Sequence, residues 1–95
     1  MSDACIFDNC IVIATHIDSE YRIYTFRVDR DALSVSLNQA IEVDGEVTCL
    51  SIGEGYALLA GVWRNHQPFL ARGLLPIPTA RLEMIGLSDC KSYYI

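Results

Sequence analysis

The amino-acid sequence predicts an all-β fold, from its size and from the way its apolar residues are grouped. The chain has 95 residues, of which 52% are hydrophobic and 20% charged, as is typical of one small globular domain. The apolar residues do not recur at helical spacing. They form runs of about five to eight residues rich in Val, Ile, Tyr, Phe and Leu, separated by short polar turns. Such runs are typical of β-strands.

Four strands are predicted in the first half of the chain. Turn-forming residues such as Asp8-Asn9 and Asp18-Ser19 separate them. In the fourth strand apolar and polar residues alternate, which predicts one face in contact with solvent. The predicted strands are 4–7, 10–17, 21–28 and 33–41.

The second half predicts four further strands after the turn dipeptide Asp44-Gly45. Pro68 stands near the beginning of the third of them and Pro76 follows its end, where the missing N–H is tolerated. Residues 88–95 show no pattern and are assigned to no element. The predicted strands are 46–52, 56–63, 69–75 and 81–87.

The two halves of the chain resemble each other. A shift of 46 residues aligns residues 10–14 with 56–60 and the turn at 18–20 with the loop at 64–66. Four short antiparallel strands in a repeat of a little above 40 residues are typical of a β-propeller blade. We therefore interpret residues 1–95 as a single partial propeller region with blades at about 4–41 and 46–87. A small β-sandwich or barrel is the alternative.

Two blades do not make a closed ring, because propellers close with about four to eight blades. The chain would then be a fragment of a propeller, and the outer face of each blade would be apolar and uncovered. We therefore expect the isolated chain to have low solubility or to self-associate through its exposed blade faces.

Two side chains of the second unit are expected to belong to its core. Cys49 is expected to pack as a small hydrophobe beside Val47 in a buried strand. Trp63, at the end of the next strand, is expected to bury its ring and to donate its indole N–H to a loop. This predicts a structural role for Trp63 rather than a role as a partner-binding hot spot.

Three segments of the second half, GEVTCLSI (45–52), ALLAGVW (57–63) and LLP (74–76), carry a resemblance to a known family. They are similar to a blade of the three-propeller proteins, which include the large subunit of the UV-damaged-DNA-binding complex, the A subunit of the cleavage and polyadenylation specificity factor and their splicing-factor relative. The resemblance covers most of residues 10–87. It implies a nuclear scaffold of WD-like repeats that holds protein partners, as a cullin ubiquitin-ligase adaptor or as an mRNA-processing subunit.

Charge and hydropathy bear on the other classes of partner. Seven Lys and Arg residues against twelve Asp and Glu give a net charge of −5, the wrong sign for a surface that binds phosphates. A nucleic-acid-binding module, to which the RNA-processing branches of the family point, is therefore a third alternative that the net charge does not support. The apolar runs fall short of the roughly 20 residues of a membrane helix, so we expect no membrane contact. The amino terminus lacks a secretory signal pattern, which predicts an intracellular protein.

No motif in the sequence indicates catalysis, a cofactor or a metal. Gly53-Glu54-Gly55 lacks the following helix and the Lys-Ser/Thr pair of nucleotide-binding loops, so it is interpreted as a tight turn. The two histidines, His16 and His66, are far apart in sequence. The four cysteines show no Cys-x-x-Cys spacing and are expected to be free and mostly buried: Cys5, Cys10, Cys49 and Cys90. The expectation is therefore a protein that is not an enzyme and binds no cofactor or metal.

Candidate partner-binding residues lie in three predicted turns. In an antiparallel sheet alternate turns emerge at the same end, which places the turns at 18–20, 44–46 and 64–66 together. They combine acidic residues with one Arg and one His, which suits protein recognition through a polar rim. The candidate residues are Asp18, Glu20, Asp44, Arg64, Asn65 and His66.

Overall fold

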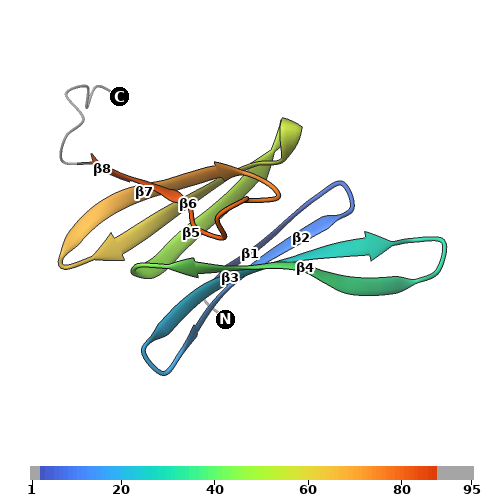
Figure 1. Cartoon of the computed structure of the whole chain (residues 1–95), viewed down its shortest axis with the longest axis horizontal. Helices are drawn as coiled ribbons and strands as arrows, with labels where there is room; N and C mark the ends of the chain where they lie inside the picture. The colour runs from blue at the N-terminus through green and yellow to red at the C-terminus, as the bar shows by residue number, and fades with distance from the viewer. Residues whose placement is uncertain (1–2, 88–95) are drawn as a thin grey trace.

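The structure is a computed structural model that describes residues 3–87, and it contains two four-stranded antiparallel sheets (Figure 1). Sheet A consists of β1 (Asp3–Phe7), β2 (Cys10–Ile17), β3 (Glu20–Asp29) and β4 (Ser34–Val43). Sheet B consists of β5 (Glu46–Gly53), β6 (Ala57–Arg64), β7 (Gln67–Leu74) and β8 (Glu83–Gly86). The predicted all-β class with two sets of four antiparallel strands is confirmed, and the two sheets do not close into a ring or barrel. The tail at 88–95 lies outside the described residues.

The last strand is shorter than predicted. The sequence predicts it over 81–87, but β8 covers only Glu83–Gly86. Arg81 instead forms an isolated parallel bridge to Glu42 of sheet A. The segment before β8 therefore leaves sheet B and contacts the edge of the other sheet. In the part of the chain that the structure describes, no helix has the length and hydrophobicity to cross a membrane.

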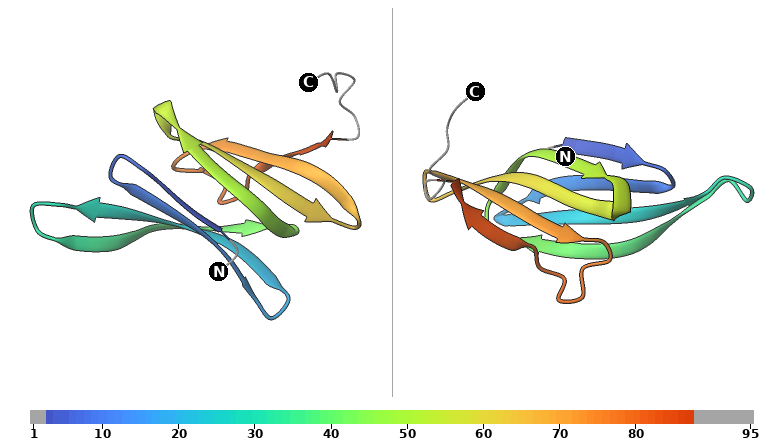
Figure 2. Two further views of the ribbon diagram at one scale, coloured as in Figure 1. Left: turned by 180° about the vertical axis from the view of Figure 1, so that it is seen from behind. Right: turned by 90° about the horizontal axis from the view of Figure 1, so that it is seen from above.

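The two sheets enclose one hydrophobic core, and Figure 2 shows them from above as two layers. Alternate residues of each strand contribute to it, because successive side chains of a strand point to opposite faces. Side chains of β2 and β6 alternate between buried and more exposed positions accordingly. The buried apolar residues are Cys10, Val12, Ala14, Ile23, Ile41, Val43, Val47, Leu58, Ala60, Val62, Ala71 and Ile77.

The connection between β7 and β8 forms hydrogen bonds with β4, the edge strand of sheet A. Ile77 in this connection is buried, and its backbone N–H donates a hydrogen bond of 2.8 Å to Oε1 of Gln39 in β4. The Gln39 amide Nε2 donates in turn to the carbonyl oxygen of Ile77. At the other edge, the backbone N–H of Leu50 in β5 donates to Oδ2 of Asp3 in β1 at 2.8 Å. Both edges of the sandwich are thus joined across the two sheets.

The two sheets correspond at a shift of 47 residues rather than the predicted 46. Strands β2 (Cys10–Ile17) and β6 (Ala57–Arg64) are each eight residues long and each second in its sheet. The extra residue lies in the connection before β6, which contains the three-residue 3₁₀ turn η1 (Glu54–Tyr56) where sheet A has only Asp8 and Asn9. A one-residue slip turns every side chain of a strand to the other face. Positions that face the core in sheet A therefore face away from it in sheet B.

A β-bulge in β5 places Cys49 outside the core. The register between β5 and β6 shifts between Val47 and Cys49, so that Thr48 is an extra residue and Cys49 pairs with Gly61. Val47 is buried, but Cys49 is exposed, so the prediction of a core position for Cys49 is wrong. The extra residue of a bulge changes which side chains of the strand point inward.

Trp63 lies on the outer face of sheet B. It follows the buried Val62 in β6, so the alternation of the strand turns its side chain away from the core. Its exposed fraction is 45%, and the prediction that its ring is buried is wrong.

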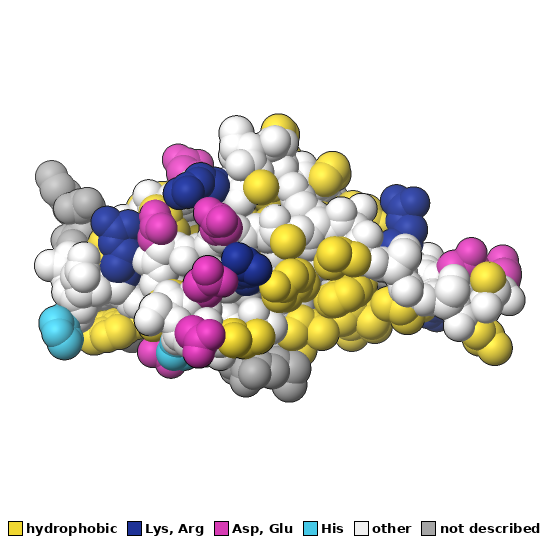
Figure 3. Space-filling model, turned by 60° about the horizontal axis from the view of Figure 1, so that its bottom comes forward, with side chains coloured by type: hydrophobic (Ala, Val, Ile, Leu, Met, Phe, Trp, Pro, Cys, Tyr) yellow, Lys and Arg dark blue, Asp and Glu magenta, His cyan; other side chains and the backbone are white. Residues whose placement is uncertain are grey.

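The outer face of sheet A carries a gathering of apolar side chains (Figure 3). Register places Ile6, Ile11, Phe26 and Leu37 opposite one another across the four strands. Ile6 and Leu37 are 63% and 58% exposed. Charged side chains gather on the other part of this face.

Candidate functional site

Three turns from both sheets meet at one end of the molecule, as the sequence predicts. They are Asp18-Ser19 between β2 and β3, Asp44-Gly45 between β4 and β5, and Asn65-His66 between β6 and β7. We call this region the turn end. It carries a shallow depression of about 550 Å³. The residues that line it are Ser19, Tyr21, Val43, Asp44, Gly45, Trp63, Arg64 and Asn65.

Backbone conformation accounts for the residues found in these turns. Asn65 and His66 have φ of 51° and 62°, as a two-residue hairpin turn with positive φ at both central positions requires. Asp18 has φ of 57°, which Asp tolerates better than most residues. Gly45 has φ of 151°, a region open to glycine because it has no Cβ.

The structure brings some of the predicted site residues together and leaves others apart. Asp44, Arg64 and Asn65 line the depression. Glu20 lines a neighbouring groove that shares Ser19 and Asp44 with it. Asp18 and His66 are exposed in the same turns but line neither hollow.

Acidic and basic side chains at the turn end form a chain of solvent-exposed ion pairs. Nη1 of Arg64 lies 3.8 Å from Oδ2 of Asp44, and Nη1 of Arg81 lies 4.0 Å from the same oxygen. Arg81 also contacts Glu42 at 3.3 Å. The side chains of these pairs are 42% to 65% exposed, and such pairs contribute only about 0–1 kcal/mol to stability. These side chains can therefore exchange their present ion pairs for ion pairs with a bound partner, with little loss of folding stability.

Sequence reasoning did not identify three of the residues that shape this end. Trp63 was assigned to the core, although it lines the depression. Glu42 and Arg81 approach each other only because the connection before β8 crosses to sheet A. No local pattern in the sequence indicates that crossing.

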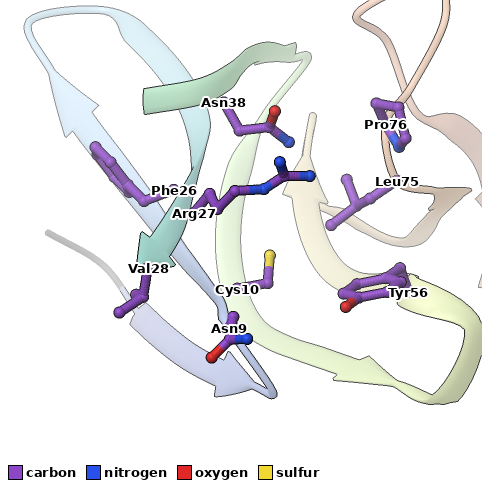
Figure 4. Close-up of a pocket in the computed structure, with 9 residues that line it drawn as sticks. All are labelled: Asn9, Cys10, Phe26, Arg27, Val28, Asn38, Tyr56, Leu75 and Pro76. Atoms are coloured by element: carbon purple, nitrogen blue, oxygen red, sulfur yellow. The ribbon is translucent and has the colours of Figure 1, made fainter. Parts of the chain in front are cut away.

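A second, deeper hollow of about 340 Å³ lies at the opposite end, between the β1–β2 turn and the chain after β7 (Figure 4). The side chain of Arg27 extends into it, with Asn38 and the thiol of Cys10 directed toward it (Figure 4). Within residues 3–87 the guanidinium of Arg27 forms no ion pair or hydrogen bond. The lining residues are Asn9, Cys10, Phe26, Arg27, Val28, Asn38, Tyr56, Leu75 and Pro76.

Two titratable groups of this pocket, Cys10 and Tyr56, have pKa values raised above their ordinary values. Burial raises the pKa of the Cys10 thiol, so less of it is thiolate at a given pH. The Tyr56 hydroxyl donates a hydrogen bond to Oδ2 of Asp8 at 3.2 Å, and this bond raises the pKa of Tyr56. The pocket is therefore suited to binding through Arg27 rather than to nucleophilic attack by Cys10. Within the described residues, no three potential metal ligands among His, Cys, Asp and Glu gather around one point.

Fold and surface define this chain as an all-β domain of two packed four-stranded antiparallel sheets. No protein-family model, curated protein or solved structure matches it. The resemblance to propeller blades accordingly stays a prediction from the sequence.

Proposed function

We propose that this domain is a non-catalytic scaffold that binds protein partners through its turn end. The observation that carries the proposal is the depression at the turn end, which residues of three turns line together with the half-exposed Trp63. Tryptophan and arginine are enriched among the residues that contribute most to protein–protein binding, and polar residues commonly form the rim of such sites. Trp63 contributes an aromatic residue to the depression, and Asp44, Arg64 and Asn65 contribute polar ones.

The finer part of the proposal concerns where such a scaffold works. The resemblance of segments 45–52, 57–63 and 74–76 to propeller blades supports a role in a nuclear multiprotein complex. In that setting the domain would serve a cullin ubiquitin ligase as an adaptor or belong to a pre-mRNA-processing complex.

A double substitution of Arg64→Glu and His66→Ala tests the turn end. It reverses the charge at position 64 and removes an exposed imidazole. Binding of protein partners in quantitative pull-downs from nuclear extract is expected to fall by about tenfold or more, as for an interface hot spot.

The matched control is Arg30→Glu, a charge reversal in the exposed β3–β4 turn outside the turn end. It is expected to leave partner binding unchanged. Equal capture of every partner by the double variant and the wild-type chain would show that the turn end is not the binding site.

The second candidate function is ligand binding, as in the β-sandwich alternative, and the pocket around Arg27 favours it. Its volume of about 340 Å³ lies within the roughly 300–1,000 Å³ of small-molecule sites, and the guanidinium suits a carboxylate or phosphate group. We expect succinate or inorganic phosphate to raise the melting temperature of the wild-type chain but not of Arg27→Gln. Arg30→Gln serves as the control. Equal melting temperatures with and without both anions would exclude this function for them.

A further inference from the structure

The outer face of sheet A carries a continuous apolar area, here called the apolar A face. The cross-strand pairs Ile6–Ile11, Ile11–Phe26 and Phe26–Leu37 form one row of it, and Ile13–Tyr24 and Val28–Val35 extend it on either side. Figure 3 shows hydrophobic side chains gathered beside the charged part of the molecular surface. The residues of the apolar A face are Ile6, Ile11, Ile13, Tyr24, Phe26, Val28, Val35 and Leu37.

The apolar A face is the repeat counterpart of the surface by which sheet B packs on sheet A. At the structural shift of 47 residues, Ile11 and Ile13 of β2 correspond to Leu58 and Ala60 of β6. Leu58 and Ala60 are 0% and 1% exposed, because sheet A covers them. Positions that correspond in the repeat are therefore buried between the sheets in sheet B but lie on the outer surface in sheet A.

The outer face of sheet B shows the converse relation. Leu59 and Gly61 correspond to Val12 and Ala14, which are both 0% exposed against sheet B. We call this outer surface the B face, and its apolar residues include Leu59, Trp63, Leu70 and Leu74. Leu59 and Leu74 are 43% and 66% exposed.

Two charged side chains of the B face are paired with each other. Arg72 and Glu83, which lie in neighbouring strands, form an ion pair of 3.1 Å there. The counterpart of Arg72 in sheet A is Thr25, which is buried between the sheets. The B face therefore presents apolar side chains around this ion pair, with the exposed Glu46 and Ser51 of β5 beside Trp63 and Leu59.

We propose that a second copy of this chain packs its B face on the apolar A face, repeating the contact that the two sheets make inside one molecule. A second copy is the occupant because every copy carries both halves of this contact. The corresponding positions already pack on each other inside one molecule, where Leu58 and Ala60 of sheet B and Val12 and Ala14 of sheet A are buried in one core. The contact joins two different surfaces, so each added copy leaves one face of each kind free. The assembly therefore grows head to tail, either to a closed ring or to an open filament. This proposal does not rest on the binding role of the turn end, although Trp63 belongs to both surfaces.

Analytical ultracentrifugation of the full chain over a range of concentrations tests the proposal. Leu37→Glu on the apolar A face and Leu59→Glu on the B face are each expected to weaken self-association by at least about tenfold, because each places a charge in the contact. Circular dichroism checks that both variants keep the β-sheet signal. The control is Leu33→Glu, in the turn between β3 and β4, where the side chain is 89% exposed and belongs to neither face.

Mixing the two single variants separates head-to-tail packing from other modes. In the mixture, the intact B face of the Leu37→Glu chain meets the intact A face of the Leu59→Glu chain, so dimers are expected to form and growth is expected to stop there. A wild-type chain that stays monomeric at every concentration overturns the proposal. It is equally overturned if Leu59→Glu associates like the wild-type chain, which would indicate packing of two like A faces.

Discussion

Replacing Leu58 with alanine is expected to lower the free energy of unfolding by about 2–5 kcal/mol. Leu58 lies in the middle of the core and is among the largest fully buried side chains of the domain. Its truncation removes buried methyl groups and leaves a cavity, and each of these effects is destabilising. Because small domains have total stabilities of about 5–15 kcal/mol, the loss is a large part of what holds the two sheets together.

Urea denaturation followed by circular dichroism measures this loss. The control is Leu33→Ala, which removes the same atoms from a side chain that is 89% exposed. It is expected to change the free energy of unfolding by less than about 0.5 kcal/mol. Similar losses in both variants would mean that the two sheets do not share the core described above.

Replacing Gly45 with alanine is expected to destabilise the domain by about 3 kcal/mol. Gly45 has φ of 151°, where a residue with a side chain is strained. An added Cβ would lie 2.8 Å from the backbone oxygen of Trp63 and 2.8 Å from Cγ1 of Val62. The Trp63 oxygen cannot move aside alone, since it belongs to a paired strand. The turn between the sheets would therefore have to shift as a whole.

The matched control for this substitution is Gly53→Ala. Gly53 has φ of −137°, and an added Cβ there would meet no atom within 4 Å. Denaturation in urea is expected to give a stability close to that of the wild-type chain for Gly53→Ala and a clear loss for Gly45→Ala. If the two substitutions have the same effect, the close packing of the β4–β5 turn against β6 is not a feature of the folded protein.

The elements that local sequence determines were predicted best. Strands and turns follow from short runs and turn dipeptides such as Asp44-Gly45, which act within a few residues. The meeting of the three turns was likewise predictable, because antiparallel neighbours place alternate turns at one end. At the candidate site, this placed Asp44, Arg64 and Asn65 correctly beside one another.

The features that depend on pairing between strands were not predictable. The bulge that exposes Cys49 exists only in the register of β5 against β6. The three-residue connection Glu54–Tyr56 changes the repeat from 46 to 47 residues, and with it the face that each side chain of β6 occupies. Trp63 was placed in the core because a large aromatic residue at a strand end suits burial, but its position beside Val62 turns it outward. In each case, a difference of one residue in the strand register determines whether a side chain faces the core or the solvent.

The pair of hydrogen bonds between the Gln39 side chain and the backbone of Ile77 also affects how the domain folds. It joins positions 38 residues apart, and the hydrogen bond from Leu50 to Asp3 joins positions 47 residues apart. Closing such long loops costs chain entropy before any contact is gained, which slows folding relative to proteins with local contacts. Hairpins within each sheet can form early in folding. The core-facing side chains of each sheet become buried only when the two sheets pack together. The two halves of the chain are therefore bound to gain and lose their structure together, as one cooperative unit rather than as two independent repeats.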